Sequence, residues 1–424
     1  MTQGFYTGVS GIKSYQTAID VTSNNLANVN TVGFRANTTE FSSLYEDTLS
    51  MTHANASHNR EDLGLGIRVS TVSMNQEHGS LMNTDLSTDL AIQDDGWFGV
   101  TGMNSDEVLY TRAGDFTFDV NNDLVTPDGF HVLGTMGNNI QGENLVQKIA
   151  EVPLGEVGSQ EPLNFPKNLV YPPEATSTAK MIGNIGIEDE VRTLGAGVID
   201  SNGTRNELKL EFTKLDEQTP PGSQWSVTAT IKSLDEQTTY DSQTYVVEFN
   251  EDGSLKTPNP FDNTTLNNNG SPVKVDLGGG YDGVVSIANF DITSSSIADG
   301  TIGGDLVGYE INQNAEVIAT FTNGQQSSVG KIGVFHFQND QGLERITGTR
   351  FKESSDSGDA IFFQDANGQN VIGTRISNYQ LENANVKMEV ALTDLIIMQR
   401  AFDSNSKLIT TADQMMQKAL NMDA

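Results

Sequence analysis

From about Ser377 to the end of the chain, a large apolar residue recurs at every seventh position. No Pro or Gly interrupts residues 378–424, so one long helix can form there. At roughly 1.5 Å per residue, a helix over residues 388–420 would be about 50 Å long. The repeat predicts a coiled-coil seam, although a long helix packed on its own domain is the simpler alternative. The apolar positions are Leu381, Met388, Leu395, Phe402, Ile409 and Met416, and three positions after Phe402 stands Asn405, the polar exception among small or apolar residues.

A second stripe with the same spacing lies at the other end of the chain. It consists of Phe5, Ile12, Ile19 and Leu26. Because starting an isolated helix in water is unfavourable, each stripe needs the other, or neighbouring subunits, to remain helical. We therefore expect the assembly surface of the protein at its two ends. The candidate interface residues are Phe5, Ile12, Ile19, Leu26, Met388, Leu395, Phe402, Asn405, Ile409 and Met416.

The charge of the chain is concentrated in its middle. The 424 residues carry a formal net charge of −32, yet residues 1–30 are neutral overall and residues 380–424 carry −2. Nearly neutral ends can pack against copies of themselves, whereas a strongly acidic middle stays solvated and self-repelling. The acidic balance argues against nucleic-acid binding, which needs a basic footprint. No apolar run approaches the roughly 20 residues of a membrane span, and no standard secretory signal is recognisable.

Between the two ends the pattern is that of β-structure. Short alternating runs with Gly and Asn at the corners occupy residues 86–134, and longer ones occupy residues 207–250. Five Pro between residues 153 and 173 predict an extended linker and a domain boundary. The fold class is therefore α+β and multidomain, with paired terminal coiled-coil helices and two mainly-β domains nested between them. We expect an inner helical domain (1–34 and 380–424), a connector (35–75), a first β domain (76–175 and 301–379) and an outer β domain (176–300).

The residue patterns that accompany catalysis or metal binding are weak in this sequence. There is no Cys, which excludes thiolate zinc sites and Cys nucleophiles. The five His are scattered, and none forms a zinc-hydrolase motif. The run Asp119-x-Asn121-x-Asp123 begins like a calcium loop, but Leu124 replaces the Gly that such a loop requires, so a hairpin turn is the better interpretation. We expect no enzyme activity and no cofactor.

Four stretches of the chain carry a family resemblance. They are NNLANVNTVGF (24–34), DLAIQDDGWF (89–98), YTRAGDFTFDVNNDLVTPDGFHVLG (110–134) and LENANVKMEVALTDLIIMQRAFDSNSKLITTADQMMQ (381–417). Together they resemble the bacterial flagellar rod–hook family of axial proteins. Within this family the chain is more similar to the hook branch than to the distal rod branch, because about 130 residues intervene between the shared regions and residues 198–216 resemble the outer domain of hook subunits.

The resemblance implies a structural subunit that polymerises into a helical tube and acts as a flexible universal joint. The paired terminal helices would line the tube, and the β domains would lie outside them. It also implies export through the flagellar secretion apparatus without a cleaved signal peptide. The implied partners are copies of the chain itself, the distal rod protein, the hook cap and the hook–filament junction proteins.

Two other functions remain open from the sequence. One is another flagellar axial component, such as a rod protein. The other is a secreted, acidic, calcium-dependent adhesin whose β domains bind a ligand. Purified protein that forms helical tubes would favour an axial protein, whereas a monomer that binds calcium or glycan would favour the adhesin.

Overall fold

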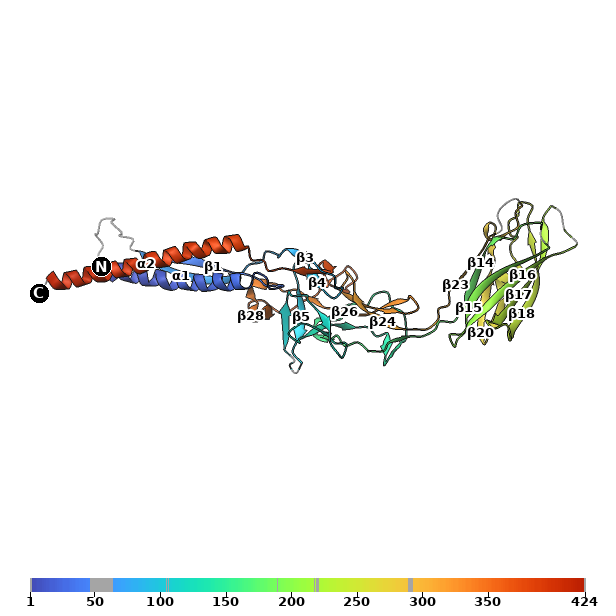
Figure 1. Ribbon diagram of the computed structural model, residues 1–424, viewed down its shortest axis with the longest axis horizontal. Helices are drawn as coiled ribbons and strands as arrows, with labels where there is room; N and C mark the ends of the chain where they lie inside the picture. Colours follow the sequence, from blue (N-terminus) through green and yellow to red (C-terminus); the bar gives the residue numbers. More distant parts are fainter. Residues whose placement is uncertain are drawn as a thin grey trace.

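The protein is elongated, with its helices at one end and a β domain at the other (Figure 1). The computed structural model describes residues 2–45, 64–103, 105, 107–188, 190–216, 218, 221–288 and 293–422. Both ends of the chain lie at the helical end, the first β domain occupies the middle, and the outer β domain lies beyond a narrow tether (Figure 1). The chain therefore leaves the helices, reaches the outer domain and returns, as the nested prediction requires.

The two long helices are α1 (Thr2–Ala27) and α2 (Met388–Met422), and they run antiparallel side by side (Figure 1). Small residues of α1 allow the close approach. A Cβ atom on Gly8 would lie 2.8 Å from Ile409, and one on Gly11 would lie 2.6 Å from the Asn405 side chain. The space at Gly11 is therefore what accommodates Asn405, whose Nδ2 donates to the Ala401 carbonyl at 2.8 Å.

The first repeat of the predicted C-terminal stripe does not belong to the helix. Leu381 lies in strand β33 (Gln380–Glu382), which pairs antiparallel with β3 (Leu81–Asn83). After it, Asn385 accepts from the Ala36 N–H and donates to the carbonyls of residues 75 and 77. These tertiary contacts hold residues 380–387 in extended structure, so the prediction of a helical segment before Met388 is wrong.

The predicted connector forms a β-hairpin along α1 in its described part. Its strands are β1 (Asn37–Tyr45) and β2 (Gly64–Met74), which pair antiparallel. The Ser14 hydroxyl of α1 donates to the Ile67 carbonyl at 3.0 Å, and the rings of Tyr15 and Phe41 lie 5.5 Å apart. The described part of the connector is therefore extended structure that packs on α1.

The first β domain is built from both flanks of the chain. Its large sheet has the path β10-β11-β13-β24-β25-β26-β9-β5-β6-β29-β28, which interleaves strands from before and after the outer domain. Aromatic residues such as Phe98, Phe116 and Phe165 fill its core. Besides β3 and β33, the described strands of this part of the chain, including those of the large sheet, are β4 (Leu90–Ile92), β5 (Trp97–Thr101), β6 (Val108–Thr111), β7 (Thr117–Phe118), β8 (Leu124–Val125), β9 (His131–Met136), β10 (Ile140–Gln141), β11 (Asn144–Leu145), β12 (Glu161–Pro162), β13 (Val170–Tyr171), β24 (Gly304–Ile311), β25 (Glu316–Phe321), β26 (Gln326–Ile332), β27 (Val334–Phe335), β28 (Glu344–Thr347), β29 (Arg350–Lys352), β30 (Phe363–Gln364), β31 (Asn370–Val371) and β32 (Ile376–Asn378).

The tether to the outer domain is shorter than the proline cluster suggests. Leu163 and Phe165 lie between the prolines and are fully buried in the core of the first β domain. The prediction of a linker over residues 153–173 is therefore wrong for most of that span, because apolar residues between the prolines pack inward. The crossing takes place after Pro172, where Glu174 and Thr301 form an antiparallel bridge with two backbone hydrogen bonds of 2.9 Å.

The outer β domain is a sandwich of two sheets. One has the order β15-β16-β17-β18, and the other has the order β19-β20-β14-β22-β21 with β23 paired to β14. Buried and more exposed residues alternate along β16 and β17, so Phe212 and Trp225 point into the core between the two sheets. The strands are β14 (Thr178–Asn184), β15 (Val191–Ile199), β16 (Arg205–Lys214), β17 (Ser223–Ser233), β18 (Thr239–Phe249), β19 (Thr265–Asn268), β20 (Ser271–Asp276), β21 (Gly278–Gly279), β22 (Asp282–Val285) and β23 (Ser294–Ala298).

Candidate assembly surface

The predicted stripe of α1 lies at the edge of its contact with α2. The fully buried positions of α1 are small or polar, and they include Gly8, Gly11 and Ala18. These positions face α2 and the β1–β2 hairpin because large side chains would keep the backbones apart. The predicted residues Phe5, Ile12, Ile19 and Leu26 are all half-buried.

The predicted stripe of α2 from Leu395 onward faces α1. Asn405 and Ile409 contact Gly8 and Gly11, and Met398 of the same face accepts a weak hydrogen bond from the Thr22 hydroxyl. Met388, at the first residue of the helix, is 47% exposed. The half-buried members of the stripe are Leu395, Phe402, Asn405, Ile409 and Met416.

A second apolar face of α2 is exposed, and the sequence-based prediction missed it. Val390, Ile397, Leu408 and Met415 are 53%, 58%, 42% and 52% exposed. Their spacings of seven, eleven and seven residues keep them on one side of a straight helix with 3.6 residues per turn. We call these four residues the α2 strip. Water-exposed apolar side chains in a row along such a helix mark a surface for another protein chain.

The residues considered for metal binding make ordinary structural contacts. Asp119 Oδ1 accepts from the backbone N–H groups of Asn121 and Asp123 at 2.7 and 2.9 Å, so this run is the turn between β7 and β8. Within the described ranges, no three His, Cys, Asp or Glu side chains gather as metal ligands would. His53 and His58 lie outside the described residues. The described helices include none that is long and apolar enough to cross a membrane.

Four flagellar protein families match successive parts of the chain. The flagella basal body rod protein family matches residues 5–35, and the flagellar hook protein FlgE/F/G D1 domain matches residues 91–187. The flagellar basal body protein FlaE D2 domain matches residues 196–356, and the flagellar basal body rod FlgEFG protein C-terminal family matches residues 378–422. Both helices and both β domains are therefore similar to parts of flagellar axial proteins.

Several hook proteins are similar to this chain over nearly its whole length. The flagellar hook protein FlgE of Borreliella burgdorferi is 29% identical over 100% of both chains, and that of Treponema pallidum is 27% identical over 100% of both. FlgE of Salmonella typhimurium is 25% identical over 99% of both chains. The crystal structure of Helicobacter pylori FlgE2 shares the fold, with a TM-score of 0.53 and 16% identity over 71% of this chain and 100% of that one. The chain belongs to the flagellar hook protein family, whose members are structural, non-enzymatic subunits.

Proposed function

We propose that this chain polymerises through its helical end into the tube of the extracellular flagellar hook. The observation that carries the proposal is the α2 strip, because it stays exposed on a helix whose neighbouring face is already packed on α1. Apolar side chains that are exposed over about 25 residues of a helix gain the hydrophobic free energy of burial only when another subunit covers them.

In this proposal the two helices act as one unit of assembly. The residues Leu395, Phe402, Asn405, Ile409 and Met416 hold α2 against α1 in a coiled-coil-like pair. Phe5, Ile12, Ile19, Leu26 and Met388 lie half-buried or exposed at its edges, where a neighbouring subunit can complete their burial. The pair then presents the α2 strip to the next copy.

The β domains are proposed to form the outer layers of the tube, with the first β domain at residues 76–175 and 301–379 and the outer one at residues 176–300. Their strong negative charge disfavours tight locking between neighbouring copies, so these layers can slide as the tube bends. Such sliding over a firmly packed inner layer is what a flexible universal joint needs to transmit torque. We further propose export without a cleaved signal peptide, and contacts with the distal rod, the hook cap and the hook–filament junction proteins.

A truncated chain tests whether the helices carry assembly. Removing residues 1–30 and 388–424 leaves the β1–β2 hairpin, both β cores and Glu382, and we expect a folded monomer that is dominated by strands. Analytical ultracentrifugation and circular dichroism measure both properties, with the untruncated chain as the control. Polymers formed by the truncated chain would contradict the proposal.

A second deletion tests whether the outer β domain is dispensable for assembly. Glu174 and Thr301 are already bridged, so residues 176–299 can be replaced by a short turn without separating the flanking strands. We expect tubes to form because neither the α2 strip nor the helix contact is removed, but we expect them to lose curvature or mechanical stability. Electron microscopy of the polymer provides the measurement, and a folded deletion protein that never enters a tube would refute the nested arrangement.

A further inference from the structure

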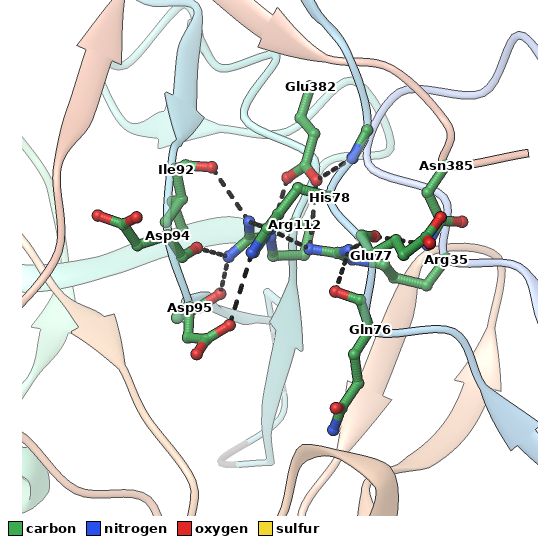
Figure 2. Close-up of polar contacts among 12 residues, drawn as sticks. Arg35, Gln76, Glu77, His78, Ile92, Asp94, Asp95, Arg112, Glu382 and Asn385 are labelled. Carbon is green, nitrogen blue, oxygen red and sulfur yellow. Dashed lines mark hydrogen bonds and ion pairs between the residues drawn. The ribbon is translucent and has the colours of Figure 1, made fainter.

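Two buried arginines and one buried glutamate lie where the helices join the first β domain (Figure 2). Arg112 Nε donates to Glu382 Oε2 at 2.9 Å, and Arg35 Nη2 lies 3.2 Å from Glu382 Oε1. All three side chains are at most 6% exposed. They come from the chain after α1, from the chain after β6 and from β33, so the cluster connects every segment that leads to the helices with the β domain.

Backbone groups complete this cluster. Arg112 donates to the carbonyls of Ile92, Asp94 and Gly96 at 3.1, 2.8 and 2.6 Å, and the Gly79 N–H donates to Glu382 Oε1 at 2.9 Å (Figure 2). Arg35 donates to the carbonyls of residues 76 and 77. Removing Glu382 would leave both arginines buried without a carboxylate partner, which is strongly destabilising.

His78 closes the cluster only in its neutral form. Its Nδ1 lies 3.1 Å from Arg112 Nη2 and 3.2 Å from Arg35 Nη2. A guanidinium group only donates, so Nδ1 must accept from both and the ring proton must lie on Nε2, which is 3.7 Å from Asp95 Oδ1. An imidazolium carries a proton on Nδ1 and could accept from neither arginine. The His78 side chain is 39% exposed, so protons reach it from solvent.

We propose that this cluster is an acid-sensitive joint, in which protonation of His78 loosens the helix pair from the first β domain. The charged groups that act on His78 are Arg112 and Arg35, which oppose the proton, and Glu382 and Asp95, which favour it. Asp95 is 81% exposed and screened by water, so the two buried arginines outweigh it. In the protonated state three positive groups would share one buried carboxylate.

The direction of the pH effect follows from the titration of the same residue. Burial lowers the pKa of His78 from its ordinary value of 6.5, and Arg112 and then Arg35 lower it further. A histidine with a lowered pKa in the folded state stabilises that state fully at pH values above 6.5, and the contribution is lost as the pH falls through the lowered pKa. The joint is therefore closed at neutral pH and opens in mild acid.

Hydrogen exchange of the whole chain, followed by mass spectrometry, tests the joint. After correction for intrinsic exchange, we expect protection factors of residues 33–36, 76–79 and 380–385 to fall about tenfold or more between about pH 7.5 and about pH 5. His78→Gln keeps an acceptor for the arginines but cannot be protonated, so this fall should be absent. His131→Gln, in β9 and outside the cluster, is the matched control and should behave like the wild type.

Two results would contradict the proposal of an acid-sensitive joint. One is a wild-type chain whose protection in these segments does not change with pH, and the other is a His78→Gln variant that loses protection as the wild type does. Should His78→Gln already lack protection at neutral pH, Asp95→Asn provides the second test. That exposed substitution removes a charge that favours the proton, so the opening should shift to lower pH at low ionic strength. A midpoint that stays in place or rises would contradict the proposal.

Discussion

Cells that carry Phe402→Asp are expected to build no hooks and to be non-motile. Phe402 is half-buried on the face of α2 that packs on α1, one heptad from both Leu395 and Ile409. The substitution removes a large apolar side chain and places a carboxylate in the helix contact, at a cost of roughly 2–4 kcal/mol. Because every subunit of the tube carries the change, the loss is repeated at each contact along the polymer.

Asp403→Ala is the matched control for this prediction. Asp403 is the next residue, lies on the exposed side of α2 and can lose its charge with little effect on the helix pair. We expect this variant to swim and to form hooks of normal appearance in electron micrographs. Normal hooks from Phe402→Asp would mean that the contact between α1 and α2 is not needed in the assembled tube.

The fold class and the family were accessible from the sequence because their signals are local. Uninterrupted apolar periodicity predicts the long helix α2, and Gly or Asn corners between alternating runs predict the β domains. The packing face of α2 was also accessible, because large residues such as Ile409 mark it. On α1, in contrast, the residues of the heptad pattern lie at the edge of the contact with α2 and not at its centre. There the closest approach is made by Gly8 and Gly11, which add nothing to a hydrophobic pattern.

Other parts of the structure depend on contacts between distant segments. Residues 381–387 continue the helical pattern of α2, yet strand pairing with β3 and the hydrogen bonds of Asn385 hold them extended. The buried cluster of Arg35, Arg112 and Glu382 unites residues that are far apart in the chain, and no sequence spacing indicates it. The α2 strip is visible as an apolar pattern, but only the position of α1 shows which of the two apolar faces remains exposed.

Because one face of α2 is exposed and the other is packed on α1, substitutions on the two faces should differ in their effect on the stability of the isolated subunit. Ile397→Asp lies in the α2 strip, where the side chain is 58% exposed, so the free energy of unfolding of the monomer should change by less than about 1 kcal/mol. Phe402→Asp, in contrast, should destabilise the helix pair before any assembly. Thermal or urea unfolding at concentrations below polymerisation measures this difference.

In the polymer the expectation for Ile397→Asp is reversed. A neighbouring subunit that covers the strip would have to bury an unpaired carboxylate, which costs several kcal/mol. Since about 1.4 kcal/mol corresponds to a tenfold change in an equilibrium constant, the critical concentration for tube formation should rise about a hundredfold or more. Gln414→Asp adds the same charge on another exposed side of α2 and should change the critical concentration far less. Sedimentation of polymer from a dilution series gives this concentration directly. Equal critical concentrations for Ile397→Asp and the wild type would show that the α2 strip faces water in the tube. The contact between subunits would then lie at the edges of the helix pair.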